Sequence, residues 1–168
     1  IWRDNPLQIV NKYLEYARNY QENQVTIIYD SMWNATRRMA EMIAEGIKSA
    51  NSDIAIKIFN SSKSDKNDII TEVFKSKAIL VGSPTINKGI LSSTAGILEM
   101  IRGLSFKNKK AAAFGSYGWG GESVKMITEE LNKAGLEVVN EGIRELWYPG
   151  DEEAQRCKTF GENFAKTL

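Results

Sequence analysis

The chain has 168 residues, of which 42% are hydrophobic and 26% charged, a composition typical of one globular domain and not of a disordered chain. Its 22 basic and 21 acidic residues nearly cancel, so there is no electrostatic argument for binding nucleic acid or an anionic membrane. It has no histidine, which disfavours zinc sites and Ser-His or Cys-His nucleophiles.

Cysteine content and hydropathy indicate the compartment. The lone Cys157 cannot form an internal disulfide, which fits a reducing cytoplasm. No apolar run approaches the roughly 20 residues that a membrane span needs. We therefore expect a cytoplasmic protein without membrane or nucleic-acid partners, and, because the chain begins at Ile1, a piece of something longer.

Residues 1–23 are predicted to form a helix that begins after Asn5 with Pro6 at an early helical position. Leu7, Val10 and Leu14 fall on one face of it, and residues 21–24 are predicted to be a polar linker. We interpret residues 1–23 as a connector helix and residues 24–168 as the main domain.

The first strand and helix of the main domain enclose a small polar turn. Residues 25–29 form a β-branched and aromatic run typical of a buried parallel strand, and apolar residues recur at helical spacing from Ala35 onward. A helix N-terminus offers unpaired N–H groups and partial positive charge, so this turn is a candidate phosphate site. Its candidate residues are Ser31, Met32, Trp33, Asn34, Ala35 and Thr36. The alternative is that Ser31 or Asn34 only caps the helix.

The remaining elements alternate between strands and helices. Strands are predicted at residues 53–59, near a sheet edge, and at 78–82, 110–114 and 136–139; helices are predicted at 68–75, 92–103, 122–134 and 151–168, the last with Asp151 as N-cap. This alternation predicts an α/β, doubly wound sheet of five parallel strands in the order 2-1-3-4-5. Its ligand site lies at the carboxyl ends of strands one and three.

Two further loops follow strands at that edge of the sheet. The second loop contributes the candidates Ser83, Pro84, Thr85, Ile86, Asn87 and Gly89, and the third contributes Ser116, Tyr117, Gly118, Trp119, Gly120 and Gly121. Neither a Walker A loop nor a dinucleotide G-x-G-x-x-G turn is present at the required place. Uncharged hydrogen-bonding groups and a flat aromatic side chain suit a flavin, and we expect FMN. The alternatives are that Trp119 only packs over the crevice and that Pro84 and Gly89 only shape a turn.

These loops together resemble a known family. Residues 31–36 match the flavodoxin phosphate loop at their first and last positions and differ from it at Trp33 and Asn34. The pattern has a threonine at the position of Trp33 and a glycine at the position of Asn34. Taken with residues 82–87 and 115–121, they look like the C-terminal flavodoxin-like domain of A-type flavoproteins, or flavodiiron proteins, which include the anaerobic nitric oxide reductase flavorubredoxins. The resemblance extends to residues 2–3 and the leading helix.

The resemblance implies one FMN, with its phosphate at residues 31–36 and its ring between residues 84–87 and 117–121. It also implies electron transfer from rubredoxin or a similar donor to a diiron centre on a preceding metallo-β-lactamase-like domain. In the family the iron ligands are histidines and carboxylates of that other domain; this sequence has no histidine, so we expect it to carry electrons and not to reduce dioxygen or nitric oxide at a diiron site. Oxygen versus nitric oxide preference and oligomeric state stay open, a homo-oligomer of the full-length protein being one alternative.

Three other functions compete with an FMN electron carrier. A flavodoxin-like NAD(P)H:quinone oxidoreductase has the same fold and cofactor. A phosphate-accepting response regulator shares the strand order, but it needs an aspartate at the end of the third strand, where this chain has Gly82 and Ser83. A purely structural interaction domain is the third. We predict the carrier, with no catalytic nucleophile or acid/base pair of its own.

Overall fold

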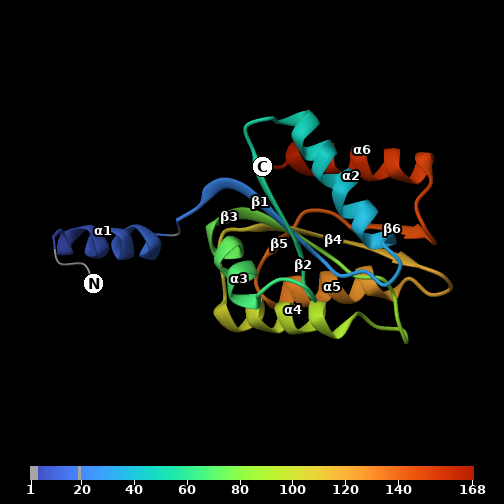
Figure 1. Ribbon diagram of the computed structural model, residues 1–168, viewed down its shortest axis with the longest axis horizontal. Coiled ribbons are helices and arrows are strands. Elements are labelled where there is room, and N and C mark those ends of the chain that lie inside the picture. Colours follow the sequence, from blue (N-terminus) through green and yellow to red (C-terminus); the bar gives the residue numbers. More distant parts are fainter. Residues whose placement is uncertain (1–3, 19) are drawn as a thin grey trace.

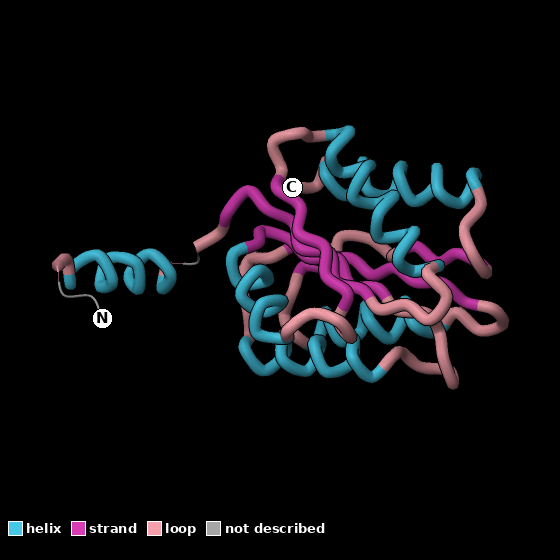
Figure 2. Tube along the Cα trace, viewed as in Figure 1, coloured by secondary structure: helices cyan, strands magenta, loops and turns pink. Residues whose placement is uncertain are grey.

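The computed structural model describes residues 4–18 and 20–168. They form an α/β fold in which a six-stranded sheet lies between two layers of helices (Figures 1 and 2). In chain order the elements are α1 (Pro6–Ala17), β1 (Glu22–Tyr29), α2 (Ala35–Ala50), β2 (Ala55–Asn60), α3 (Lys66–Lys75), β3 (Ser76–Gly82), α4 (Ser92–Leu104), β4 (Lys110–Tyr117), α5 (Glu122–Lys133), β5 (Glu137–Val138), β6 (Ile143–Leu146) and α6 (Asp151–Ala165). No helix in this described part of the chain has the length and apolarity to cross a membrane.

The strand order is β2-β1-β3-β4-β5 with parallel pairing, which confirms the predicted doubly wound sheet. Helices α2 and α6 cover one face, and α3, α4 and α5 cover the other (Figure 1). Successive residues of the central strands alternate between the two cores: Ile27 packs on the α2 and α6 side, and Ile28 packs on the opposite side. This burial on both faces explains why these strands are continuous apolar runs.

The edge beside β4 holds a strand that the sequence analysis missed. Strand β5 pairs with the start of β4, and β6 pairs with its end, where Ile143 lies opposite Phe114 and Leu146 opposite Tyr117. A turn at residues 140–142 separates them, with Gly142 at φ 81°. The prediction of one fifth strand at residues 136–139 is therefore incomplete, because the same edge continues through β6.

The N-terminal segment differs from its prediction. Helix α1 ends at Ala17, and Glu22 already belongs to β1, opposite Ser76 of β3, so the predicted linker at residues 21–24 is mostly strand. Gln24 is buried and donates to the Ser76 hydroxyl at 3.0 Å, which favours sheet pairing over a solvated linker. Residues 1–3 and 19 of the predicted helix, including the resemblance at residues 2–3, lie outside the described residues.

The starts of two helices also differ from their predictions. Helix α3 begins at Lys66, earlier than predicted, because the Asp65 side chain caps it by accepting from the Asn67 N–H at 2.7 Å. Asp151 is the first residue of α6 and not its N-cap; Gly150 occupies the cap position, and its N–H donates to Glu153 at 3.0 Å.

Helices α2 and α6 pack closely through two glycines. A Cβ added at Gly46 of α2 would lie 2.0 Å from the Lys158 carbonyl oxygen of α6. A Cβ added at Gly161 of α6 would lie 2.2 Å from the Ile43 carbonyl oxygen of α2. The backbones of the two helices therefore approach more closely than any other residue type at these positions would allow.

Candidate functional site

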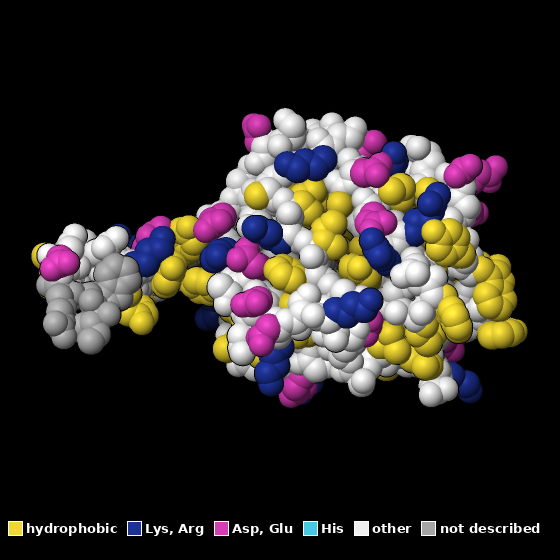
Figure 3. Space-filling model, in the orientation of Figure 1, with side chains coloured by type: hydrophobic (Ala, Val, Ile, Leu, Met, Phe, Trp, Pro, Cys, Tyr) yellow, Lys and Arg dark blue, Asp and Glu magenta, His cyan; other side chains and the backbone are white. Residues whose placement is uncertain are grey.

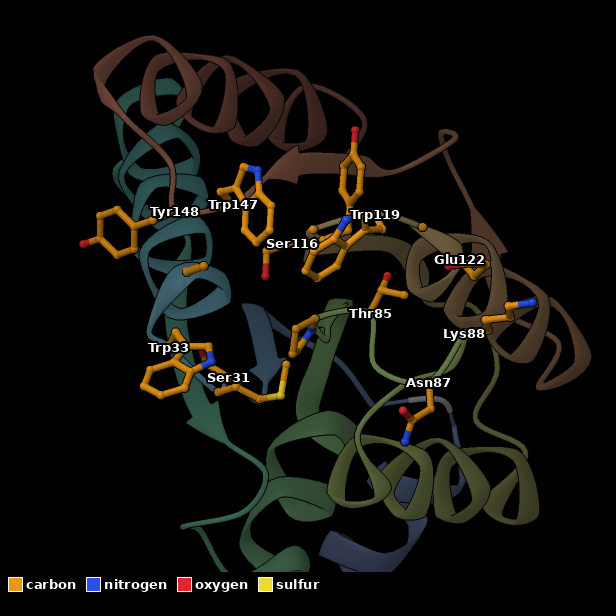
Figure 4. A pocket seen from close by; sticks show the side chains of 16 residues that line it. Ser31, Trp33, Thr85, Asn87, Lys88, Ser116, Trp119, Glu122, Trp147 and Tyr148 are labelled. Atoms are coloured by element: carbon orange, nitrogen blue, oxygen red, sulfur yellow. The ribbon is translucent and has the colours of Figure 1, made fainter.

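A cavity of about 730 Å³ opens at the carboxyl ends of the central strands (Figure 4). Its walls come from the turn after β1, the loop after β3, the loop between β4 and α5, and the segment after β6. Its volume lies in the range of about 300–1,000 Å³ usual for small-molecule sites. On the face shown in Figure 3, hydrophobic side chains gather at the end of the molecule away from α1.

Backbone hydrogen bonds that extend the sheet hold these segments together. The Asp30 N–H donates to the Gly82 carbonyl at 3.1 Å, and the Thr85 N–H donates to the Ser116 carbonyl at 2.8 Å. The Trp147 N–H donates to the Tyr117 carbonyl at 2.8 Å. The order of the strands in the sheet therefore sets which loops meet at the cavity.

The turn after β1 combines a left-handed residue with an unpaired hydroxyl. Asn34 has φ 62°, a conformation that asparagine adopts more readily than most residues, so it takes the place of the glycine in the flavodoxin pattern. The Ser31 Oγ is buried and has no hydrogen-bond partner among the described residues. A buried hydroxyl without a partner is costly, which makes this atom available to a ligand.

The loop after β3 presents polar groups from a compact turn. The Thr85 hydroxyl donates to Ser123 Oγ at 3.0 Å and fixes the loop to the start of α5. Ile86 and Gly89 exchange backbone hydrogen bonds at 3.2 and 2.7 Å, with Asn87 and Lys88 between them at φ 49° and 57°. The tight turn directs Asn87 and Lys88 outward at the rim of the cavity (Figure 4).

The loop between β4 and α5 carries the most exposed aromatic side chain of the site. Trp119 is 90% exposed, and its ring centroid lies 5.1 Å from that of Trp147 in an edge-to-face arrangement. Trp33, which is 84% exposed, lies on the opposite wall (Figure 4). The cavity is therefore open to a planar ligand between aromatic side chains.

The structure brings most of the predicted site residues to the cavity wall. Those that line it are Ser31, Met32, Trp33, Ala35, Pro84, Thr85, Asn87, Ser116, Tyr117, Gly118, Trp119 and Gly120. The others shape its loops behind the wall: Asn34, Thr36, Ser83, Ile86, Gly89 and Gly121. The Thr36 hydroxyl pairs with Ser116 Oγ at 2.9 Å, and the Ser83 hydroxyl accepts from the Leu91 N–H at 3.0 Å. Gly121, at φ 119°, precedes α5.

The cavity also has lining residues that the sequence analysis did not predict. These are Lys88, Glu122, Trp147 and Tyr148. Trp147 and Tyr148 follow β6, so missing that strand meant missing them. Two adjacent aromatic residues beyond a short strand at residues 143–146 are the only sequence signal that could have pointed to them.

The lining is nearly neutral. Among the described lining residues, formal charge comes from Lys88 and Glu122. Arg37 pairs with Glu41 at 2.8 Å, which raises the pKa of Arg37, and Arg38 lies 3.6 Å from Asp151 with its guanidinium over the Tyr148 ring. Both arginines of the first turn of α2 therefore lie close to acidic side chains, Glu41 and Asp151. No cluster of three or more His, Cys, Asp or Glu side chains suited to a metal ion occurs in the described ranges.

Comparisons with known proteins agree with this geometry. The flavodoxin family matches residues 27–160. The chain is 51% identical over 166 residues to the anaerobic nitric oxide reductase flavorubredoxin of Aliivibrio salmonicida and 45% identical to that of Escherichia coli O1:K1, in each case over 99% of this chain. It spans 33% and 34% of those two relatives, about a third of their length.

Solved structures give the same result. The rubredoxin oxygen:oxidoreductase of Desulfovibrio gigas superposes with a TM-score of 0.91 at 35% identity, over 98% of this chain and 40% of that one. The flavodiiron protein of Giardia intestinalis gives 0.90 at 27% identity, over 98% and 41%. An archaeal flavodoxin gives 0.77 at 30% identity, over 86% and 97%. The chain belongs to the flavodoxin family, as a flavodoxin-like domain of the kind found in flavorubredoxins and flavodiiron proteins.

Proposed function

We propose that the chain binds one FMN in this cavity and serves as the electron-transfer domain of a longer flavodiiron-type protein. The observation that carries the proposal is the buried, unpartnered Ser31 Oγ beside the N-terminus of α2, in a cavity whose other walls are neutral, polar and aromatic. A helix N-terminus with free N–H groups binds a phosphate, and a hydroxyl there completes its hydrogen bonds.

The residues present fit both ends of FMN. Residues 31–36 would hold the phosphate through backbone N–H groups and the Ser31 hydroxyl. Pro84, Thr85 and Asn87 would contact one edge of the isoalloxazine, and Tyr117 to Gly121, with Trp119 foremost, would cover a face of it. Uncharged hydrogen-bonding groups can hold a flavin ring and tune its potential, while the redox chemistry belongs to the cofactor.

The cofactor and the protein would have separate roles in electron transfer. FMN supplies the redox chemistry when bound. The chain would position it: the backbone hydrogen bonds of Asp30, Thr85 and Trp147 fix the loops around the cavity. The indoles of Trp33 and Trp119, which line the cavity, would shield a bound ring from water. Neither general acid nor nucleophile is required from the protein for electron transfer.

The parent protein supplies the remaining steps of the proposal. The relatives are named flavorubredoxin, rubredoxin oxygen:oxidoreductase and flavodiiron protein, and this chain matches a third to two fifths of their lengths. We propose that this chain receives electrons from a rubredoxin-like donor and passes them to a diiron centre on a metallo-β-lactamase-like domain of the same protein. We place that longer protein in the cytoplasm. The iron ligands are assigned to that other domain because this sequence has no histidine.

Titration of the flavin-free chain with FMN tests the proposal. We expect saturation at one FMN per chain, with quenching of flavin fluorescence because an indole lies against the ring. Riboflavin, which lacks the phosphate, should bind much more weakly. Failure to bind FMN would refute the proposal, and rapid bleaching of bound FMN by NAD(P)H alone with quinone turnover would favour a quinone oxidoreductase instead.

A further inference from the structure

We propose that Trp147 is a positioning residue that holds the Trp119 indole in the orientation in which it covers the flavin ring. The inference rests on the proposed function and adds a role for the residue that directly follows β6, the strand that completes the edge of the sheet. It stands on the backbone of Trp147, on the contact between the two indoles, and on the lack of a side chain at Gly118.

The backbone of Trp147 is held in an uncommon conformation. Its φ is 57°, in the left-handed region that bulky residues rarely adopt. Its N–H donates to the Tyr117 carbonyl at 2.8 Å, one step beyond the pairing of Leu146 with Tyr117. The sheet therefore fixes the point from which the Trp147 side chain leaves the chain, hydrogen-bonded to Tyr117, which lies two residues before Trp119.

The space over Gly118 receives the Trp147 ring. A Cβ added at Gly118 would lie 3.0 Å from both Cη2 and Cζ3 of Trp147. An alanine here would press against the indole, so the glycine lets the Trp147 ring lie close against the third loop. From that position its ring meets Trp119 edge to face, with centroids 5.1 Å apart and an interplanar angle of 78° (Figure 4).

Trp119 has few other constraints. It is 90% exposed and stands between Gly118, Gly120 and Gly121, the residues with the greatest backbone freedom. Among the aromatic side chains of the described residues, Trp147 is the one that contacts its ring. A side chain ordered before the ligand arrives binds more tightly, because less entropy is lost on binding. An edge-to-face pair corresponds to about a two- to tenfold change in an equilibrium constant.

A double-mutant cycle tests this inference. The FMN dissociation constant is measured for the wild type, Trp147→Leu, Trp119→Leu and the double variant, with Trp147→Phe as the conservative replacement. Leucine and phenylalanine carry similar strain at φ 57°, so their difference reports the aromatic contact. We expect Trp147→Leu to weaken FMN binding about two- to tenfold, Trp147→Phe to retain most of the affinity, and Trp147→Leu to have no further effect when Trp119 is already leucine.

A second perturbation leaves Trp147 in place. Gly118→Ala presses a methyl group against its ring, so it should weaken FMN binding in the wild type and much less in Trp147→Leu. Tyr13→Leu, on the exposed face of α1, is the matched control for loss of a surface aromatic and should not change the affinity.

The flavin-free chain separates failure of this inference from failure of the proposed function. Two indoles 5.1 Å apart should give a coupled circular-dichroism band that disappears in Trp147→Leu and in Trp119→Leu alike. If the wild type does not bind FMN, the proposed function fails, and the coupled band alone decides whether Trp147 orients Trp119. An absent band, an unchanged FMN affinity in Trp147→Leu, or an equal loss of affinity in the Trp119→Leu background would overturn the inference, the last because Trp147 would then act only on the fold.

Discussion

The contact between α2 and α6 gives the sharpest test of the packing. We consider Gly46→Ala in α2, where the new Cβ would lie 2.0 Å from the Lys158 carbonyl oxygen, 2.8 Å from its carbonyl carbon and 3.0 Å from its Cα. All three are backbone atoms of another helix, so no side chain can rotate away. The two helices must separate, and the reciprocal contact at Gly161 must open with them.

The magnitude follows from two opposing terms. Overpacking of a core costs roughly 1–3 kcal/mol, and a backbone obstacle places this site at about 3 kcal/mol. Replacing a helical glycine by alanine gains about 1 kcal/mol of helix propensity. The expected net loss for Gly46→Ala is therefore about 2 kcal/mol in the free energy of unfolding.

Gly96 in α4 provides the matched control. It is exposed, and within the described part of the chain nothing lies within 4 Å of the Cβ that an alanine would add. The same substitution there should stabilise the protein by about 1 kcal/mol through helix propensity alone. The two variants should thus move in opposite directions.

Denaturant unfolding of the flavin-free chain measures both effects. FMN is left out because a ligand that binds the folded state would raise the apparent stability. We expect the midpoint to fall for Gly46→Ala and to rise for Gly96→Ala, with the slope unchanged for each. If Gly46→Ala were as stable as Gly96→Ala, the backbones of α2 and α6 could not lie as close together as the structure shows, and this account of their packing would be wrong.

Three further expectations concern single residues. Asn34→Val should lose roughly 1–2 kcal/mol of stability and weaken FMN binding, because a β-branched residue resists φ 62°, whereas Asn34→Gly should retain both in the same unfolding and titration assays. Burial lowers the pKa of Lys109 to about 8 from an ordinary 10.5, so between those pH values the unfolded state binds more protons and the free energy of unfolding rises with pH. Relative to Lys109→Met, the wild type should gain up to about 1.4 kcal/mol per pH unit in that window. A difference in unfolding free energy between the two proteins that does not change with pH would refute this. Burial raises the pKa of Cys157 to about 12, so its thiol should not react with a thiol reagent at pH 8 until denaturant unfolds the chain; prompt reaction in the folded protein would contradict its burial.

The strand order could be predicted because the central strands carry their own signal. Ile27, Ile28, Ile79 and Leu80 are all fully buried, half of them toward each helix layer, and this gives uninterrupted apolar runs between helical patterns. The polar turns then had to meet at one edge, because the carboxyl ends of parallel strands lie together. The three candidate loops came from this reasoning and from resemblance.

Strand β6 could not be predicted, because its identity depends on a distant partner. Its four residues include Arg144 and Glu145, which are not typical of a strand, and it exists by pairing with β4. Glu145 is buried, and Arg156 of α6 neutralises it through two hydrogen bonds of 2.9 and 2.6 Å. Nothing in the sequence indicates that ion pair or the strand, so the two cavity-lining residues that follow the strand, Trp147 and Tyr148, could not be predicted either.

Helix α1 shows what helical periodicity cannot predict. Its period predicted an apolar stripe, yet Leu7, Val10 and Leu14 are each about half exposed or more, and α1 extends away from the sheet (Figure 1). Periodicity identifies a helix and the face it would bury. It does not identify what covers that face.

The central claim is that the turn after β1, the loop after β3 and the loop after β4 together enclose FMN. Backbone amide NMR of the chain, recorded without and with one equivalent of FMN, tests it most directly. We predict that the large shift changes fall together in residues 31–36, 85–87 and 117–121, with smaller ones at residues 147–148. Changes confined to one loop, or changes on another face of the sheet, would contradict the account.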